Sequence, residues 1–127
     1  MDDATQTKPY EIVHEERPGY LYVSVTAPDI SYHIAREYWR ETLRRVNAAG
    51  STRLMFHKQI AATLSMADIY TVGAELAGEL VSVKLAVVDK HTAPEIIDFR
   101  ELVLTNRGVS TKTFSDEDTA EAWLLAG

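Results

Sequence analysis

Hydrophobic and polar positions follow two different periods along this chain. Runs rich in β-branched and aromatic residues predict five strands. These runs cover residues 10–15, 20–25, 52–56, 83–88 and 109–114. Apolar residues that recur every three or four positions predict four helices. The helical stretches lie between Asp29 and Gly50, over 69–80, over 93–106 and over 116–126.

The order of these elements indicates how the sheet is built. The segment "ERPG" separates the first two strands and carries the Pro and Gly of a short turn, so these strands predict a hairpin. From the second strand on, helices and strands alternate through short connections, which is typical of right-handed crossovers between parallel strands. We therefore predict a single α/β domain with a mostly parallel sheet, an initial hairpin strand, the order ββ(αβ)3α and helices packed on the sheet.

The start of the chain carries no such pattern. Its first residues, "MDDATQTKPY", are polar and acidic, without the basic segment and apolar core of a secretion signal. We expect residues 1–9 to form a flexible N-terminus, residues 10–127 to form the domain, and the protein to be cytoplasmic.

The composition argues against some classes of binding partner. The 127 residues carry a formal net charge of -6, which argues against nucleic acid or an anionic membrane as the main partner. No apolar run approaches the roughly 20 residues that span a bilayer, so we do not expect a membrane protein. The chain has no cysteine, which excludes disulfides, a catalytic thiol and thiolate metal sites.

No group of residues forms a recognisable catalytic or metal motif. The histidines His14, His33, His57 and His91 stand far apart, without His-x-x-x-His spacing. A serine nucleophile needs a strained turn such as Gly-x-Ser-x-Gly, which the sequence lacks. We therefore expect no metal, no cofactor and no enzymatic activity.

The C-terminal third carries a family resemblance. The segments "VKLAVVDK" and "TKTFSDEDTAEAWL" are similar to the stand-alone SpoIIAA-like branch of the STAS domains. The matching residues are Leu85, Ala86, Val87, Val88, Phe114, Ala122, Trp123 and Leu124. This resemblance implies a small α/β domain, often dimeric, that serves as a regulatory or ligand-sensing module. The related Sec14-like lipid-carrying domains imply an apolar ligand as an alternative.

Ser65 occupies the position that phosphorylation regulates in some members of this family. Their regulated hydroxyl opens the helix after the third strand, and the corresponding stretch here is "TLSMADI". Only Ser65 matches in type, because Leu64, Met66 and Ala67 replace the other motif residues. Ser65 and Asp68 also have the spacing of a capping box. We therefore favour a helix cap at Ser65, with a phosphorylation or partner site at Ser65 and Asp68 as the alternative.

The same capping-box spacing occurs twice more in the second half of the chain. Thr92 with Glu95 and Ser115 with Asp118 precede the last two predicted helices. Three occurrences at three predicted helix starts favour one structural explanation for all of them.

A second candidate site lies where predicted strands end. His57 follows the third strand, and Asp89 and His91 follow the fourth. Open α/β sheets bind ligands at the carboxyl ends of their strands, so these residues are a candidate ligand-binding edge beside the first two long helices. Surface histidines without a ligand are the competing interpretation.

Two functions therefore remain open from the sequence. The first is a non-enzymatic regulatory module that binds a protein partner, and the second is a domain that binds a small apolar or anionic ligand. The helix at 93–106 has a stripe of Ile96, Phe99 and Val103, with Ile97 and Leu104 lying off it. That surplus predicts a homodimer contact, unless it belongs to a deeper core.

Overall fold

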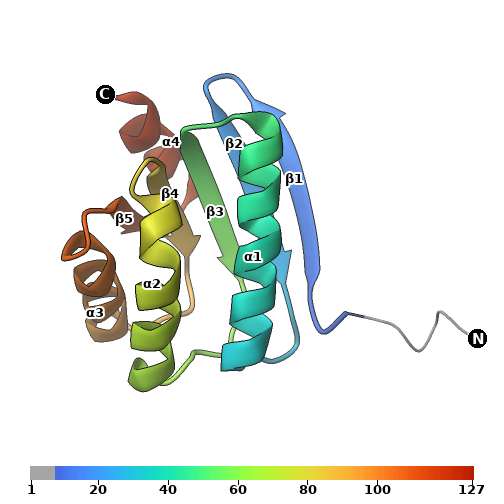
Figure 1. Cartoon of the computed structure of the whole chain (residues 1–127), viewed down its shortest axis with the longest axis vertical. Helices are drawn as coiled ribbons and strands as arrows, with labels where there is room; N and C mark the ends of the chain where they lie inside the picture. The colour runs from blue at the N-terminus through green and yellow to red at the C-terminus, as the bar shows by residue number, and fades with distance from the viewer. Residues whose placement is uncertain (1–7) are drawn as a thin grey trace, which may run out of the picture.

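The computed structural model describes residues 8–127. It consists of a five-stranded sheet with helices on both faces (Figure 1). Its strands are β1 (Glu11–Arg17), β2 (Tyr20–Thr26), β3 (Arg53–Gln59), β4 (Lys84–Asp89) and β5 (Ser110–Phe114). Its helices are α1 (Tyr32–Ala49), α2 (Met66–Leu80), α3 (Pro94–Thr105) and α4 (Glu117–Leu125). The predicted order ββ(αβ)3α is confirmed.

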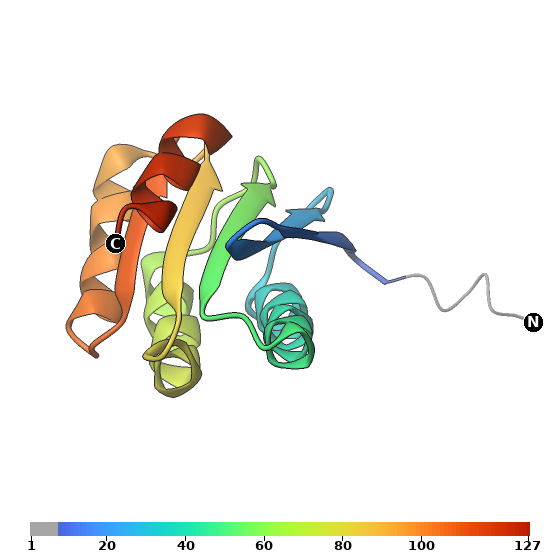
Figure 2. The ribbon, with the colours of Figure 1, turned by 90° about the horizontal axis from the view of Figure 1, so that it is seen from above.

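The spatial order of the strands follows their order in the chain. Strand β1 pairs antiparallel with β2, and every later pair is parallel. Because successive right-handed crossovers advance in one direction, α1, α2 and α3 lie on one face of the sheet. Helix α4 lies on the opposite face (Figure 2). The sheet is therefore covered on both sides around β3 and β4.

Strand alternation divides the core between these two faces. Leu54, Phe56 and Leu85 point toward α1 and α2, whereas Met55 and Val88 point toward α4. Side chains on successive strand residues project to opposite faces, so strands that are covered twice are buried almost throughout. The "LAVV" run of β4 is such a strand.

The hairpin turn consists of Pro18 and Gly19, as the "ERPG" segment predicts. Gly19 has φ of +89°, a backbone conformation that favours glycine. A Cβ at this position would also lie 2.9 Å from Cδ2 of Leu125, at the end of α4. The turn therefore packs closely against the last helix.

The N-terminal boundary is described only in part. Residues 1–7 of the predicted flexible segment lie outside the described residues, and Lys8 and Pro9 are exposed. The Lys8 ammonium donates to Oε1 of Glu41 over 3.0 Å, and the buried Tyr10 hydroxyl donates to the same atom over 2.9 Å. The chain is thus attached to α1 from Lys8 onward, and the predicted division at residue 10 stays a prediction.

Two of the predicted helix caps are wrong, and one is correct. Thr92 does not cap α3, because its hydroxyl donates to Oδ2 of Asp89 over 2.7 Å. Helix α4 is capped by Asp116, one residue after the predicted Ser115, through a 2.7 Å bond to the Thr119 N–H. Ser65 caps α2, as predicted, by accepting from the Asp68 N–H over 3.1 Å.

The predicted start of α1 at Asp29 is also corrected. Ser31 is the cap residue, and its hydroxyl accepts from the Ile34 N–H over 3.2 Å. Oδ1 of Asp29 accepts from the N–H of the next residue, Ile30, over 2.8 Å, which is a local turn bond. The helix therefore begins two residues later than the sequence pattern suggests.

Candidate functional site: a cavity with a charged end

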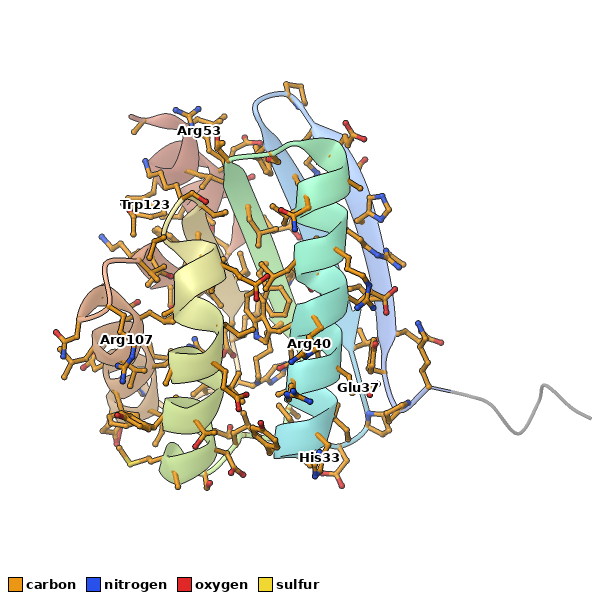
Figure 3. The ribbon with its side chains drawn as sticks, viewed as in Figure 1. His33, Glu37, Arg40, Arg53, Arg107 and Trp123 are labelled. Atoms are coloured by element: carbon orange, nitrogen blue, oxygen red, sulfur yellow. The ribbon has the colours of Figure 1, made fainter. Side chains whose placement is uncertain are left out.

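A cavity of about 80 Å³ lies between α1, α2 and the sheet. Side chains fill most of the gap between the two helices, and charged residues such as Glu37 and Arg40 lie on α1 (Figure 3). The walls of the cavity are mainly apolar and come from α1, α2, α3, β3 and β4. They include Ala35, Tyr38, Trp39, Phe56, Val72, Leu76, Leu85, Val87 and Leu104. The cavity therefore lies beside the first two long helices, where the sequence predicts a ligand cleft.

Local packing produces the apolar walls. Phe56 and Val87 are register partners on β3 and β4, and both face α1 and α2. Trp39 stacks on Phe56 with ring centroids 4.2 Å apart and an interplanar angle of 19°. On the other side, a Cβ at Gly73 would lie 2.8 Å from Cγ1 of Val103, so this glycine allows α2 to pack closely on α3.

Asp89 lies behind the polar end of the cavity, where it contacts the lining residues Thr92 and Arg100 without lining the cavity itself. Its carboxylate has no exposed surface and accepts from the His91 N–H over 3.0 Å and from the Thr92 hydroxyl. Arg100 Nη1 on α3 donates to Oδ2 over 3.0 Å. Burial raises the pKa of Asp89, but these bonds and the charges of Lys58 and Arg100 outweigh burial and lower it. The group is therefore an ionised carboxylate inside the fold.

Lys58 supplies a second buried cation at this end. The residue is 7% exposed, and its Nζ donates to the carbonyl oxygens of Ile60 over 2.8 Å and Ala62 over 3.2 Å. Nζ lies 3.9 Å from Oδ2 of Asp89. The pKa of Lys58 is lowered overall, because burial and the charge of Arg100 outweigh the opposing charge of Asp89. Lys58 thus connects the segment before α2 to the sheet through hydrogen bonds.

Tyr38 brings a hydroxyl to the same region from α1. The residue is 3% exposed and lines the cavity, and no residue among 8–127 forms a hydrogen bond with its hydroxyl. Burial raises the pKa of Tyr38. The side chain shares the lining of the cavity with Lys58 and Arg100. Among residues 8–127, the fully buried side-chain nitrogen or oxygen without a hydrogen-bond partner is Arg36 Nε, so the Tyr38 hydroxyl oxygen keeps accessible surface and can bond to a molecule in the cavity that Tyr38 lines.

His57 does not belong to this site, which corrects the predicted ligand edge. Strand β3 continues to Gln59, so His57 lies inside the strand and points to the face that α4 covers. Its Nδ1 is 2.8 Å from Oε2 of Glu117 and 3.0 Å from the Tyr22 hydroxyl. Because strand residues alternate between faces, Lys58 points into the cavity and His57 points away from it.

The other two residues of the predicted ligand edge, Asp89 and His91, also differ in where their side chains lie. Asp89 contacts the lining residues of the polar end from behind. The side chain of His91 is exposed, and only its backbone N–H contacts Asp89. Lys58, Arg100 and Tyr38 were missed as site residues. The alternation of a longer third strand would have placed Lys58 beside Asp89, but nothing in the sequence pairs Arg100 with that carboxylate.

A separate polar network attaches α4 to the first three strands. Glu117 accepts from the Tyr22 hydroxyl over 2.9 Å and from Arg17 Nη1 over 3.2 Å, besides its contact with His57. The guanidinium of Arg17 also lies 3.8 Å above the ring of Tyr22. Burial raises the pKa of Glu117, but these donors lower it overall. The network holds the helix in place on the sheet.

Ser65 and Asp68 lie at the exposed start of α2. Met66 is 46% exposed and Tyr70 is 50% exposed, one helical turn apart on the same helix. The connection from Lys58 to Ser65 includes Leu64, which lines the cavity. The exposed surface around Ser65 is therefore close in sequence to a residue of the cavity wall, but it is a separate candidate site.

Other sites are weaker among residues 8–127. A wider, open hollow of about 590 Å³ beside Tyr10 and Pro28 has Lys8 as its only lining cation. No cluster of histidine, aspartate or glutamate could hold a metal ion in the described part of the chain. None of its helices is long and apolar enough to cross a membrane.

The arrangement of strands and helices is shared with a solved structure. This is an uncharacterized protein from the DUF3478 family with a SpoIIAA-like fold, from Shewanella loihica PV-4. The TM-score is 0.59 with 17% sequence identity, and the match covers 91% of this chain and 93% of that chain. The chain therefore has a SpoIIAA-like fold, which confirms the predicted fold class. No family model matches the sequence, and no curated protein matches it.

Proposed function

We propose that this protein is a non-enzymatic domain that binds a small molecule in the cavity between α1 and α2. The observation that supports the proposal is the combination of apolar walls with the hydroxyl of Tyr38, which has no partner among residues 8–127. Ligand sites are typically apolar pockets with a few convergent polar groups. The carboxyl ends of the strands are also the usual ligand position in open α/β sheets.

The size of the cavity limits the ligand. At about 80 Å³ the cavity has roughly half the volume of an engineered apolar cavity of ~150 Å³ that binds benzene. A compact ligand fits with small side-chain movements. A larger one requires the segment 60–64 to move outward, and this segment belongs to no helix or strand.

The test is an NMR titration of the full chain with butanol and, separately, with butyrate, which share one alkyl chain. Binding in the cavity shifts the resonances of the Trp39 indole and the Phe56 ring with saturation. Ala35→Leu fills space at the cavity wall and abolishes these shifts. Ala48→Leu, the same substitution on the exposed side of α1, leaves them unchanged. The proposal fails if neither probe gives saturable shifts, or if Ala35→Leu has no effect.

A second candidate function is the regulatory or protein-interaction module that the family resemblance implies. The exposed Met66 and Tyr70 beside Ser65 support it, because apolar side chains gathered at one exposed helix start favour a protein contact. Its test is the intact mass of the protein from its native cell, compared with a Ser65→Ala variant. One phosphate that disappears in the variant supports regulation at Ser65. An unmodified protein leaves Ser65 as a helix cap only.

The predicted homodimer belongs to this second function. Leu104 is buried against the cavity and so belongs to the core, whereas Ile97 is half-buried and Leu102 is 55% exposed on α3. Light scattering after size exclusion, at several protein concentrations, measures the oligomeric state directly. A Leu102→Ser variant that shifts the mass toward the monomer would assign the contact to α3.

A further inference from the structure

We infer that the ligand of the cavity is a small monoanion with a compact apolar body, and that its carboxylate binds beside Tyr38, Lys58 and Arg100. This inference rests on the proposed function, because it names the chemical class of the ligand for the same cavity. Three separate observations support it: the balance of charge, the unused hydrogen-bond donors and the volume.

The balance of charge at the polar end favours an anion. Lys58 and Arg100 are two cations, and Asp89 is the one carboxylate within 4 Å of them. Among the described residues, the end of the cavity therefore carries one more positive than negative side chain. A net positive charge at a site with little water favours the binding of one negative charge from a ligand. A second negative charge on the ligand would face Asp89, which argues against a dianion.

The donors available at this end match a carboxylate. Nζ of Lys58 has three hydrogens, of which two are directed to the carbonyl oxygens of Ile60 and Ala62. The third is left with Asp89 at 3.9 Å, beyond hydrogen-bond distance. The Tyr38 hydroxyl is a second donor without an acceptor among residues 8–127. Two donors without an acceptor among the described residues favour a ligand group that accepts, such as a carboxylate, over an ammonium group, which only donates.

The apolar walls determine the rest of the ligand. Phe56, Val87 and Leu76 offer no polar side-chain atom, so the body of the ligand must be hydrocarbon. The volume of about 80 Å³ selects a short alkyl or small cyclic body. The ligand class is therefore a short-chain or small-ring monocarboxylate.

Three probes with one alkyl chain separate the head group from the body: butyrate, butanol and butylamine. In NMR titrations of the full chain, we expect butyrate to bind at least about ten-fold more tightly than butanol, because its charge-assisted bonds are stronger. Butylamine should give no saturable shift at Trp39. Equal affinity for butyrate and butanol overturns the carboxylate inference but leaves the proposed function standing. No binding by either probe overturns both.

The role of the Tyr38 hydroxyl in binding can be tested with one variant and a matched control. Tyr38→Phe should lower butyrate affinity about ten-fold and butanol affinity clearly less, because a hydrogen bond to a charged carboxylate is stronger than one to a neutral hydroxyl. It should not lower the stability of the free protein, since that hydroxyl has no partner to lose among residues 8–127. Tyr10→Phe removes a hydroxyl that does donate, to Glu41, so it should lower stability and leave both affinities unchanged. Unchanged butyrate affinity in Tyr38→Phe contradicts the inference.

Discussion

The guanidinium of Arg100 on α3 donates to the carboxylate of Asp89 at the end of β4, with 3.0 Å between Nη1 and Oδ2. The carboxylate has no exposed surface, and the Arg100 side chain is 19% exposed. Removing one partner of a buried ion pair leaves the other charge without compensation, which is more unfavourable than the loss of an exposed pair. The polar end of the cavity is therefore also a structural support for α3.

Asp89→Ala should destabilise the protein by about 3–5 kcal/mol. The substitution leaves Lys58 and Arg100 as buried cations and removes the acceptor for the Thr92 hydroxyl. Urea unfolding followed by circular dichroism measures this loss. Asp29→Ala is the control, since that exposed carboxylate accepts only from the N–H of the next residue, and it should change stability by less than about 0.5 kcal/mol. A similar loss in both variants would contradict the structural role of Asp89.

Glu41 should make the stability of the protein depend on pH. Burial raises the pKa of Glu41, but bonds from Lys8, Arg45 and Tyr10 outweigh it and lower the pKa from 4.5 to about 2. Because the folded pKa is depressed, the stabilisation is present above pH 4.5 and is lost as the pH falls toward 2. Allowing for solvent screening of the exposed Lys8, we expect a contribution of about 2 kcal/mol at neutral pH.

Glu41→Gln tests this pH dependence. The variant should be less stable than the wild type at pH 7, and the two unfolding free energies should converge as the pH falls through the range in which Glu41 titrates. Glu37→Gln, on the exposed side of the same helix, should follow the wild type at every pH. A constant difference between wild type and Glu41→Gln across the whole range would show that the carboxylate charge is not responsible.

Ser65→Ala should reduce stability by about 1 kcal/mol, the usual loss when a side-chain helix cap is removed. Ser65→Asp should retain most of the stability, because aspartate also caps helix starts. Ser115→Ala is the matched control at a serine that the sequence predicts as a cap but that caps nothing. Thermal unfolding of the three variants distinguishes them, and equal losses at Ser65 and Ser115 would contradict the assigned caps.

Glu117→Ala should loosen α4 on the sheet. The carboxylate accepts from Tyr22 and Arg17 and contacts His57, so its removal breaks the bonds by which this side chain attaches α4 to β1, β2 and β3. We expect amide hydrogen exchange in α4 to accelerate at least about ten-fold relative to Asp118→Ala. Asp118 is in the same first turn of the helix, so both variants lose one charge near the helix dipole. Equal exchange rates would exclude the network as the attachment of α4.

The order of helices and strands could be predicted because the hydrophobic periods of both kinds of element are clear in the sequence. The "LAVV" run and the three-and-four spacing from Ile34 to Val46 reflect burial that the sheet and α1 require. Helix starts were predicted less well. Thr92 has the right spacing for a cap, but its hydroxyl is used by Asp89, a contact that depends on the tertiary arrangement of the β4–α3 connection.

The site could be predicted only in outline. The strand pattern predicts Asp89 at the carboxyl end of β4, and the strand does end at this residue. His57 was assigned to that edge because the polar run "HKQ" resembles a loop, yet β3 continues through it. Lys58 can occupy a buried strand position because carbonyl oxygens and Asp89 compensate its charge. Such compensation is invisible to a pattern of hydrophobic and polar residues.

The strand order of the sheet has a consequence for synthesis on the ribosome. Because β2, β3, β4 and β5 emerge in the order in which they pair, each new strand meets an edge that already exists. No later strand has to insert between two strands that are already paired, and each new strand is added at the same edge of the sheet. The opposite edge, β1, carries Glu15, Glu16 and Arg17, charges that discourage pairing with another nascent chain. The protein can thus assemble from its N-terminus as it is made.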